Sequence, residues 1–490
     1  MRYLCDTQIE SINDCKSDRF VVRLSTKKYA LMNKLGQIYD YDFDEIEPRD
    51  DGCYEVKISG EKILIDSECN VIASGFKDVG EFSNDGIATV YYNDGSSKWI
   101  NRDGSVFGEG LKPVNDFING IGVVQHEDTS LQELVYIPTP EKLNNLGEHE
   151  TLRDDGLVLS GLLADGFSCF LNKNYSWVES FGRSAYLIDR TFKKIAGPFE
   201  RVFDIFDNDV ALCYEHDKVT GHPQYFFFDI ARKKRLFEPF KYFSVFDGEI
   251  ARVPCFDRNY HFINQNGEPI NNKGYFSASE FSENLSIITE ISEITHEHQM
   301  TYLRKNGTMF KNWYDVCSDE SEGLCAVQNK NRGFYLNEFE EMVGKSFYRT
   351  YSFHEGNAVV QARKGEYTYI DRNFKRFVES FDHAGDFSCG FGVVKNDGVY
   401  DAVNKNQIRL SSISGLVKEI ETDPEMFLNL PTEVYEDLEL LEELFNFAID
   451  VCEKYRSQFD GEEYKTFVDK KIVSILNAYS VYKENKQLGN

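Results

Sequence analysis

Residues 356–371 read Gly-Asn-Ala-Val-Val-Gln-Ala-Arg-Lys-Gly-Glu-Tyr-Thr-Tyr-Ile-Asp. The first five residues place small and β-branched side chains after a glycine, and the last six are rich in aromatic and β-branched side chains. Both compositions are typical of β-strands. The stretch therefore predicts two successive strands, and its first segment recurs elsewhere in the chain.

The recurring segment has the form Gly, any residue, a small residue, any residue, Val. Clear copies begin at Gly86, Gly120, Gly356 and Gly390. With looser copies included, the third residues of the segment are Phe20, Tyr54, Ala88, Gly122, Ser168, Ala211, Ala251, Ser286, Cys325, Ala358 and Gly392. Successive copies lie 34 residues apart through the first four and 33 to 46 residues apart afterwards. This period indicates a repeat protein of about eleven units.

Each unit carries further regular features. An aromatic residue usually stands a few positions before the glycine, as Phe353 does, and we expect it to pack against the next unit. The second segment ends in Asp or Asn and is often followed by a glycine turn such as Asn266-Gly267. Such turns supply the positive φ that a tight hairpin needs. Each unit is therefore predicted as a strand, a hairpin strand and a short return strand.

These segments resemble the bacterial WG-repeat (KWG-type) family, whose unit contains Phe-x-x-Gly-Leu-Ala-x-Val followed by Lys-Trp-Gly-Tyr-Ile-Asp. The resemblance covers roughly residues 17–410, and residues 366–371 stand at the second motif. No Trp-Gly dipeptide occurs in the chain. The tyrosines that replace the Trp are Tyr29, Tyr225, Tyr260 and Tyr367. The family is defined by its repeat and has no shared catalytic activity, so the resemblance implies a binding or scaffolding role.

The expected fold is an all-β repeat architecture, either propeller-like or an open β-solenoid of about eleven three-stranded units, with a small C-terminal α-helical domain. Propellers typically have about four to eight blades, so an open stack or two propeller-like groups are alternatives. We favour a ring because closure removes exposed strand edges. The expected divisions are a lead-in (1–16), a first group of repeats (17–137), an irregular junction (138–160), a second group (161–410) and an acidic helical tail (411–490).

In the tail, the hydrophobic period changes from two to 3.6 after about Ser411. Asp423 and Pro424 predict a helix N-cap and first turn. Two apolar stripes predict two or more antiparallel helices that cap the last unit. The stripes are Leu441, Leu444, Phe445, Ala448, Ile449 and Cys452, then Val468, Ile472, Ile475, Leu476 and Tyr479. An acidic cluster at Glu433, Glu436, Asp437, Glu439, Glu442 and Glu443 is interpreted as a solvated face, with a docking surface as the alternative.

Composition limits the cellular compartment and the binding partners that we expect for this chain. Hydrophobic residues make up 41% of 490 residues, with no apolar run long enough to cross a membrane and no apolar leader at the start. The eleven cysteines include no Cys-x-x-Cys pair, which favours reduced thiols in a cytoplasm. The formal charge of −28 repels phosphate backbones. We therefore expect a cytoplasmic protein with no membrane contact and no direct nucleic-acid binding.

The sequence contains no recognised catalytic or phosphate-binding motif. The nearest metal candidate, His296-Glu297-His298, lacks a third ligand. An Asp or Asn ends the second segment in unit after unit, which predicts turn capping. These residues are Asn33, Asp66, Asn101, Asp189, Asp229, Asn264, Asn337, Asp371 and Asn404. No catalytic, cofactor-binding or metal-binding residue is assigned, no cofactor is expected, and the binding residues stay unassigned.

The leading functional hypothesis is a non-catalytic protein-interaction scaffold or binding module whose partner is an unidentified protein. The partner would contact one face of the repeats or the helical tail. One alternative is a propeller-type carbohydrate-active hydrolase with paired carboxylates in a central pocket. Another is a sensor or decoy component of a bacterial conflict (anti-phage) system, suggested by the acidic charge and the divergence of the repeats.

Overall fold

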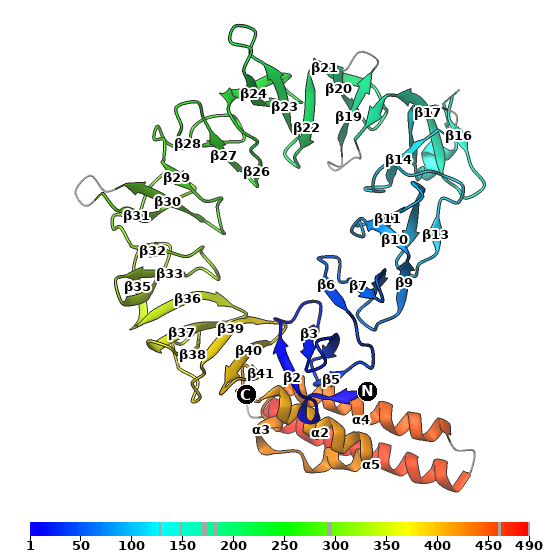
Figure 1. The fold of residues 1–490 in the computed structure, drawn as a ribbon, viewed down its shortest axis with the longest axis vertical. Helices are drawn as coiled ribbons and strands as arrows, with labels where there is room; N and C mark the ends of the chain where they lie inside the picture. Colours follow the sequence, from blue (N-terminus) through cyan, green and yellow to red (C-terminus); the bar gives the residue numbers. More distant parts are fainter. Residues whose placement is uncertain are drawn as a thin grey trace.

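A computed structural model describes residues 1–126, 129–147, 149–168, 174–180, 184–291, 296–458 and 462–488. Eleven antiparallel sheets follow one another around a ring, and the C-terminal helices lie beside the first and last sheets (Figure 1). The fold is an eleven-bladed β-propeller with a small set of C-terminal helices. The ring is therefore the form that the repeats adopt, and neither the open stack nor the two separate groups is present.

The first four sheets take up the N-terminal third of the chain. Sheet 1 contains β1 (Arg2–Tyr3), β2 (Ile9–Ile12), β3 (Arg19–Leu24), β4 (Tyr29–Asn33) and β5 (Gln37–Ile38). Sheet 2 contains β6 (Glu45–Pro48), β7 (Tyr54–Ile58), β8 (Glu61–Ile65) and β9 (Val71–Ser74). Sheet 3 contains β10 (Phe76–Val79), β11 (Ile87–Tyr92), β12 (Ser97–Asn101) and β13 (Val106–Phe107). Sheet 4 contains β14 (Ile121–Gln125), β15 (Gln132–Tyr136), β16 (Thr151–Leu152) and β17 (Val158–Ala164).

The next four sheets form the part of the ring opposite the chain termini. Sheet 5 contains β18 (Gly166–Phe167), β19 (Tyr175–Ser180), β20 (Ser184–Asp189) and β21 (Lys194–Phe199). Sheet 6 contains β22 (Arg201–Ile205), β23 (Val210–His216), β24 (Pro223–Asp229) and β25 (Lys234–Phe240). Sheet 7 contains β26 (Phe246–Asp247), β27 (Ile250–Pro254) and β28 (Tyr260–Asn264). Sheet 8 contains β29 (Ser277–Ala278), β30 (Leu285–Ile291) and β31 (His298–Arg304).

Three more sheets bring the chain back to its start. Sheet 9 contains β32 (Val316–Cys317), β33 (Cys325–Asn329), β34 (Arg332–Leu336) and β35 (Met342–Phe347). Sheet 10 contains β36 (Arg349–His354), β37 (Asn357–Arg363) and β38 (Glu366–Asp371). Sheet 11 contains β39 (His383–Ser388), β40 (Phe391–Asn396) and β41 (Val399–Asn404).

The number of strands per sheet differs from the three that the repeat predicts. Sheets 7, 8, 10 and 11 have three strands, whereas the other seven have four or five. Even in the three-stranded sheets the chain returns along the third strand and pairs with it at isolated bridges, such as Tyr260 with Tyr275 and Tyr367 with Phe381. The return segment thus covers the outer edge of these sheets, which would otherwise expose unpaired backbone groups.

The repeated glycine lies in a tight turn between the first two strands of a sheet. Glu355 and Gly356 have φ values of 51° and 77°, and Cys389 and Gly390 have φ values of 53° and 85°. Two successive residues with positive φ form the turn type that matches the twist of a β-hairpin. This backbone requirement explains the glycine that marks each clear copy of the repeat.

In four of the sheets an aromatic residue of the second segment connects the sheet to the next one. The indole Nε1 of Trp99 donates to the carbonyl of Asn115 at 2.9 Å, and the hydroxyl of Tyr369 donates to the carbonyl of Gly385 at 2.7 Å. Tyr302 and Tyr335 make the equivalent bonds, and all four side chains are fully buried. A Cβ atom at Gly392 would overlap the Tyr369 hydroxyl, which explains the small third residue of the repeat.

Acidic residues in the tight turns form a second connection between neighbouring sheets. The carboxylate of Glu355, in sheet 10, accepts the backbone N–H groups of Cys389 at 2.8 Å and Gly390 at 2.6 Å in sheet 11. The carboxylate of Glu283 accepts the N–H groups of the Glu322-Gly323 turn in the same way. In the sequence Glu355 stands before the repeat glycine Gly356 and Glu283 stands before Asn284, but the role of these acids is visible only once neighbouring turns are adjacent.

Two expected divisions lie inside the ring. Residues 138–160, expected as an irregular junction, carry α1 (Pro140–Leu143) and β16 and lead into β17, and both strands belong to sheet 4. Residues 1–16, expected as a lead-in, supply β1 and β2 to sheet 1 together with the short 3-10 helix η1 (Leu4–Asp6). The longer spacing between the fourth and fifth copies thus reflects an insertion within one sheet.

The tail forms helices, as the 3.6-residue period predicts. They are α2 (Leu410–Thr422), the 3-10 helix η2 (Pro424–Asn429), α3 (Thr432–Tyr435), α4 (Leu438–Gln458) and α5 (Glu462–Leu488). Asp423 caps the start of η2 by accepting the N–H of Glu425 at 3.2 Å, with Pro424 in the first turn. The first predicted stripe is confirmed, because all its residues lie in or against one buried cluster. In the second stripe Leu476 is an exception, since its side chain is exposed.

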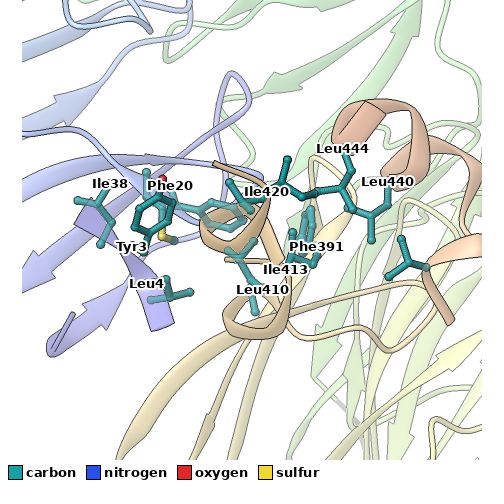
Figure 2. Close-up of a cluster of buried hydrophobic side chains, with 14 of the residues drawn as sticks. Tyr3, Leu4, Phe20, Ile38, Phe391, Leu410, Ile413, Ile420, Leu440 and Leu444 are labelled. Atoms are coloured by element: carbon teal, nitrogen blue, oxygen red, sulfur yellow. The ribbon is translucent and has the colours of Figure 1, made fainter. Parts of the chain in front are cut away.

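The ring closes where sheet 1 meets sheet 11, and the helices fill the joint. One buried cluster combines Phe20 and Ile38 of sheet 1, Phe391 of sheet 11, and side chains of α2 and α4 (Figure 2). The rings of Phe20 and Phe391 lie 5.9 Å apart. We call this joint the seam. The tail therefore packs on the last unit, as expected, and on the first unit as well, so that it holds the two ends of the ring together.

The acidic cluster of the tail is not merely a solvated face. The Asp437 carboxylate accepts the side-chain amide of Asn404 at 2.7 Å and the N–H of Leu440 at 3.1 Å. Glu443 lies 3.6 Å from the Lys34 ammonium, and Glu439 lies 3.6 Å from the Lys405 ammonium. Three of the six acidic residues therefore bind sheets 1 and 11 of the same chain, so this half of the cluster is a docking surface within the molecule.

Candidate interaction surface

A row of aromatic side chains crosses sheet 6. Tyr214 of β23 faces Arg201 of β22 on one side and Tyr225 of β24 on the other, and Tyr225 faces Phe240 of β25. The ring centroids of Tyr214 and Tyr225 are 5.4 Å apart, and those of Tyr225 and Phe240 are 6.4 Å apart. Aromatic pairs on adjacent strands stabilise a sheet, so the row has a structural role.

Two further phenylalanines extend this row into solvent. Phe203 lies two residues after Arg201 in β22, where the pairing register with β23 shifts. Its ring lies 5.6 Å from that of Tyr225 and 6.0 Å from that of Tyr214. Phe243, in the connection to sheet 7, lies 6.3 Å from Phe203. Phe203 is 41% exposed and Phe243 is 51% exposed, whereas Phe240 is fully buried. We call Phe203, Tyr214, Tyr225, Phe240 and Phe243 the aromatic patch.

The patch runs across sheet 6, from β22 through β23 and β24 to β25 and the connection that follows it. In Figure 1, β22 and β26 are the strands of sheets 6 and 7 nearest the opening of the ring. Tyr242, next to Phe243 in the chain, is exposed as well. Single exposed apolar side chains are ordinary, but contiguous exposed aromatic rings are typical of interaction sites.

The charged groups beside the patch are paired with one another. The Glu200 carboxylate lies 2.8 Å from Nδ1 of His216, and Nε2 of that imidazole lies 3.2 Å from the Tyr214 hydroxyl. Glu215 accepts two hydrogen bonds of 2.6 Å from Arg235, and this bonding lowers the pKa of Glu215. Burial raises the pKa of Asp204, which accepts the N–H of Ile205. Because these polar groups already have partners, the exposed ring faces of Phe203 and Phe243 are the sites left for a ligand.

The structure brings together no metal-binding set among the residues it describes. His298 begins β31, whereas His296 has a φ of 56° and precedes the strand. The two imidazoles therefore do not have the spacing along a strand that would place them on one face.

The recurring Asp and Asn residues cap turns, as predicted. The Asp371 carboxylate accepts the N–H groups of Asn373 and Lys375, each at 2.9 Å. The same two hydrogen bonds, accepted from the backbone N–H groups two and four residues later in the chain, occur at Asn33, Asp66, Asp189, Asn264, Asn337 and Asn404. Asp229 instead accepts the N–H of Arg232, and Asn101 donates its side-chain amide to Ser105. These residues hold turns.

One cavity with two carboxylates lies beside sheet 3. It has a volume of about 540 Å³ and is lined by residues 94–99 and 106–112, all within sheet 3 and its following loop. Its carboxylates, Asp94 and Glu109, are exposed, and Asp94 accepts the N–H of Ser96 at 2.8 Å. A glycosidase needs two facing carboxyl groups at a substrate-sized site. The geometry of this cavity does not favour the hydrolase alternative.

Sequence reasoning did not find the patch. In the sequence Tyr225 is one of the repeat tyrosines, and Phe203 and Phe243 lie in segments that carry no clear repeat motif. Their spacing in the chain gives no sign that their rings meet. One feature of the sequence could have indicated the patch: an aromatic residue at a strand position whose side chain is expected to face solvent. Phe203 has such a position in β22, since Val202 and Ile205 are the buried residues of that strand.

Within the described part of the chain, none of the helices has the length and apolar character needed to span a membrane. The ten cysteines that the structure describes are free thiols, as expected, and Cys169 lies outside the described residues.

Comparisons with known proteins add little to this description. No protein-family model and no curated protein matches the chain. Among solved structures, the chain is similar to a eukaryotic initiation factor at 8% identity, covering 74% of this chain and 96% of that one with a TM-score of 0.38. It is also similar to BamB from Moraxella catarrhalis at 8% identity, covering 74% and 92%, with a TM-score of 0.24. With both scores below 0.5, the fold assignment rests on the sheets themselves.

Proposed function

We propose that this propeller is a non-catalytic protein-interaction module that binds a basic segment of a partner protein through its aromatic patch. The observation that carries the proposal is the set of contiguous rings on sheet 6, of which Phe203 and Phe243 are exposed. The resemblance to WG-repeat proteins fits such a role, because that family shares a repeat and not a reaction.

The charge of the chain favours a basic partner. A net charge of −28 attracts cationic segments over several ångströms and speeds their association. Exposed aromatic faces bind guanidinium and ammonium groups through cation–π contacts. Inside this molecule the Lys241 ammonium lies 4.9 Å from the centroid of exposed Tyr242, and this contact supports a cation-binding role for rings beside the patch. Arginine is the expected anchor since its planar group stacks on rings better than lysine does.

The test uses defined peptides and the full-length chain. Fluorescein-labelled peptides rich in arginine, rich in lysine, or rich in glutamate are titrated with the protein at low and at physiological salt, and binding is followed by fluorescence anisotropy. We expect the arginine peptide to bind most tightly, more weakly at higher salt, and the glutamate peptide not to bind. The double variant Phe203→Ser/Phe243→Ser should weaken arginine-peptide binding by roughly tenfold or more, as is usual for aromatic anchors.

Phe339→Ser is the matched control, because Phe339 is an exposed phenylalanine in a turn of sheet 9, away from sheet 6. Its affinity for the arginine peptide should equal that of the unaltered protein. Equal binding by the patch variant and the control would show that charge alone attracts the peptide and that the patch is not the site.

A further inference from the structure

Two cysteines meet at the seam where the ring closes. Cys15 precedes β3 of sheet 1, and Cys389 lies in the turn between β39 and β40 of sheet 11. Both pack on the same buried cluster, Cys15 within it and Cys389 against it. Residues at the two ends of the repeat array thus bring their thiols to one joint.

Hydrogen bonds hold the two segments together at this point. The Ser388 hydroxyl donates to the carbonyl of Cys15 at 2.6 Å and lies 3.9 Å from Sγ of Cys389. Glu355 holds the backbone of Cys389 and Gly390 through two further bonds. The turn that carries Cys389 is therefore fixed against the segment that carries Cys15, and the Cys389 thiol lies close enough to raise the pKa of the Cys15 thiol.

The two thiols differ in their access to solvent. Cys15 is buried. Burial is the main cause that raises the pKa of its thiol, and the nearby Cys389 thiol raises it further. Cys389 is half-buried and lines a cavity of about 40 Å³ beside Lys34 and Glu443. A cavity of this size holds a molecule as small as water or hydrogen peroxide. A small oxidant would therefore meet Cys389 first.

We propose that Cys15 and Cys389 form a reversible disulfide that locks the ring closed under oxidising conditions. Hydrogen peroxide oxidises the Cys389 thiol to a sulfenic acid, breaking its O–O bond and releasing one water. The Cys15 sulfur then attacks the sulfenic sulfur, the S–S bond forms, and the hydroxyl leaves with the Cys15 proton as a second water. The two thiols lose two electrons in total, and the peroxide gains them. A small thiol such as glutathione reverses the step by exchange.

The bond would change how the ring is held. In the reduced protein, closure depends on the packed cluster and the hydrogen bonds of the seam. A disulfide would join residues that are far apart in the chain, and such links restrict the unfolded state most. This modification is independent of the aromatic patch on sheet 6, so the peptide-binding test and the oxidation test can fail separately.

The experiment treats the reduced full-length chain with hydrogen peroxide, blocks the remaining thiols with N-ethylmaleimide, and analyses the digest by mass spectrometry without reductant. We expect a peptide cross-linked between Cys15 and Cys389, an upward shift of Tm, and loss of both on adding reductant. Cys389→Ser should abolish the cross-link and the shift. The matched control is Cys5→Ser, which removes an exposed thiol of sheet 1 and should change neither.

Cys15→Ser provides a second variant, and in it Cys389 should accumulate as the sulfenic acid that a dimedone probe traps. Because Cys15 is buried, folding of this variant is checked first by circular dichroism. If the Cys15→Ser variant does not fold, the proposal is decided by whether Cys389→Ser abolishes the cross-link and the shift of Tm. A digest in which Cys389 is oxidised but never linked to Cys15, or is linked to a second chain, would overturn the proposal.

Discussion

At the scale of single residues, the charges buried between neighbouring sheets have the clearest consequences. The Asp51 side chain is 2% exposed and accepts bonds from Arg49 at 3.0 Å and from the N–H groups of Cys53 and Phe82 at 3.0 and 2.9 Å. Arg49 also donates to the carbonyl of Gly80, between β10 and β11 of sheet 3, at 2.6 Å. Burial opposes ionisation of Asp51, but Arg49 and the two N–H groups lower its pKa below the usual value.

We predict that Asp51→Asn lowers the free energy of unfolding by about 3 kcal/mol at pH 7, because it leaves the Arg49 guanidinium buried without its counter-charge. Since the folded pKa of Asp51 is lowered, its contribution is present above the unfolded pKa of about 3.9 and is lost as pH falls below it. Urea denaturation at pH 7 and at pH 3 measures both effects. Asp50→Asn, at an exposed neighbour, is the control and should change little.

Glu320 presents the opposite case. Its side chain is buried, the carboxylate accepts the N–H of Asn284 at 2.7 Å, and burial raises its pKa. A raised carboxyl pKa means that the ionised form destabilises the fold above that pKa and has no effect below the unfolded value near 4.3.

Glu320→Gln keeps an acceptor for the N–H of Asn284 and removes the charge, so we expect a higher Tm at pH 7. The difference should shrink as pH approaches 4, because the native glutamate is then neutral. Thermal unfolding across this pH range, with Glu109→Gln at an exposed site for comparison, is the measurement. A lower Tm for Glu320→Gln at pH 7 would contradict the argument.

At the scale of elements, four of the joints between sheets contain a buried aromatic residue of the second segment. The Tyr369 side chain is fully buried between sheets 10 and 11, and its ring lies 4.9 Å from that of Phe387. The ring fills the joint, and the hydroxyl fixes the register of β39 by its bond to Gly385. The two parts of this side chain can be tested separately.

Tyr369→Phe should lower the free energy of unfolding by about 1 kcal/mol, the usual value of one hydrogen bond. Tyr369→Ala should cost about 4 kcal/mol, since it also leaves a cavity. Chemical denaturation of both variants gives the comparison, with Tyr41→Phe at an exposed tyrosine as the control. Equal losses for the two Tyr369 variants would show that packing does not hold the joint.

At the scale of the whole molecule, the C-terminal helices decide whether the ring stays closed. No strand described here passes from sheet 11 into sheet 1, so that no backbone ladder joins them. The seam is held by the buried cluster, to which α2 contributes Leu410, Ile413, Val417 and Ile420, all fully buried (Figure 2). The Ser414 hydroxyl of α2 also donates to the carbonyl of Gly36 at 3.0 Å.

We predict that Ile413→Ala weakens the seam by about 3 kcal/mol through loss of buried apolar contact. Hydrogen exchange should become faster in β2 and β41, which flank the seam, and should change least in sheets 5 and 6 across the ring. Val473→Ala removes an exposed side chain of α5 and should leave exchange unaltered. Uniformly faster exchange around the ring would mean that the whole molecule, and not the seam, had been loosened.

The sequence by itself determined the repeat, its number of units, the strand pairs, the capping role of the Asp and Asn residues and the helical tail. These follow from local requirements: alternation within strands, positive φ at turns, and 3.6-residue spacing in helices. The tertiary structure decided the closure into one ring and the packing of the tail at the seam between sheets 1 and 11. It also decided the aromatic patch and the proximity of Cys15 to Cys389. Residues 15 and 389, or 203 and 243, become neighbours only through the path of the folded chain, and a single sequence contains no local pattern that reports such distant contacts.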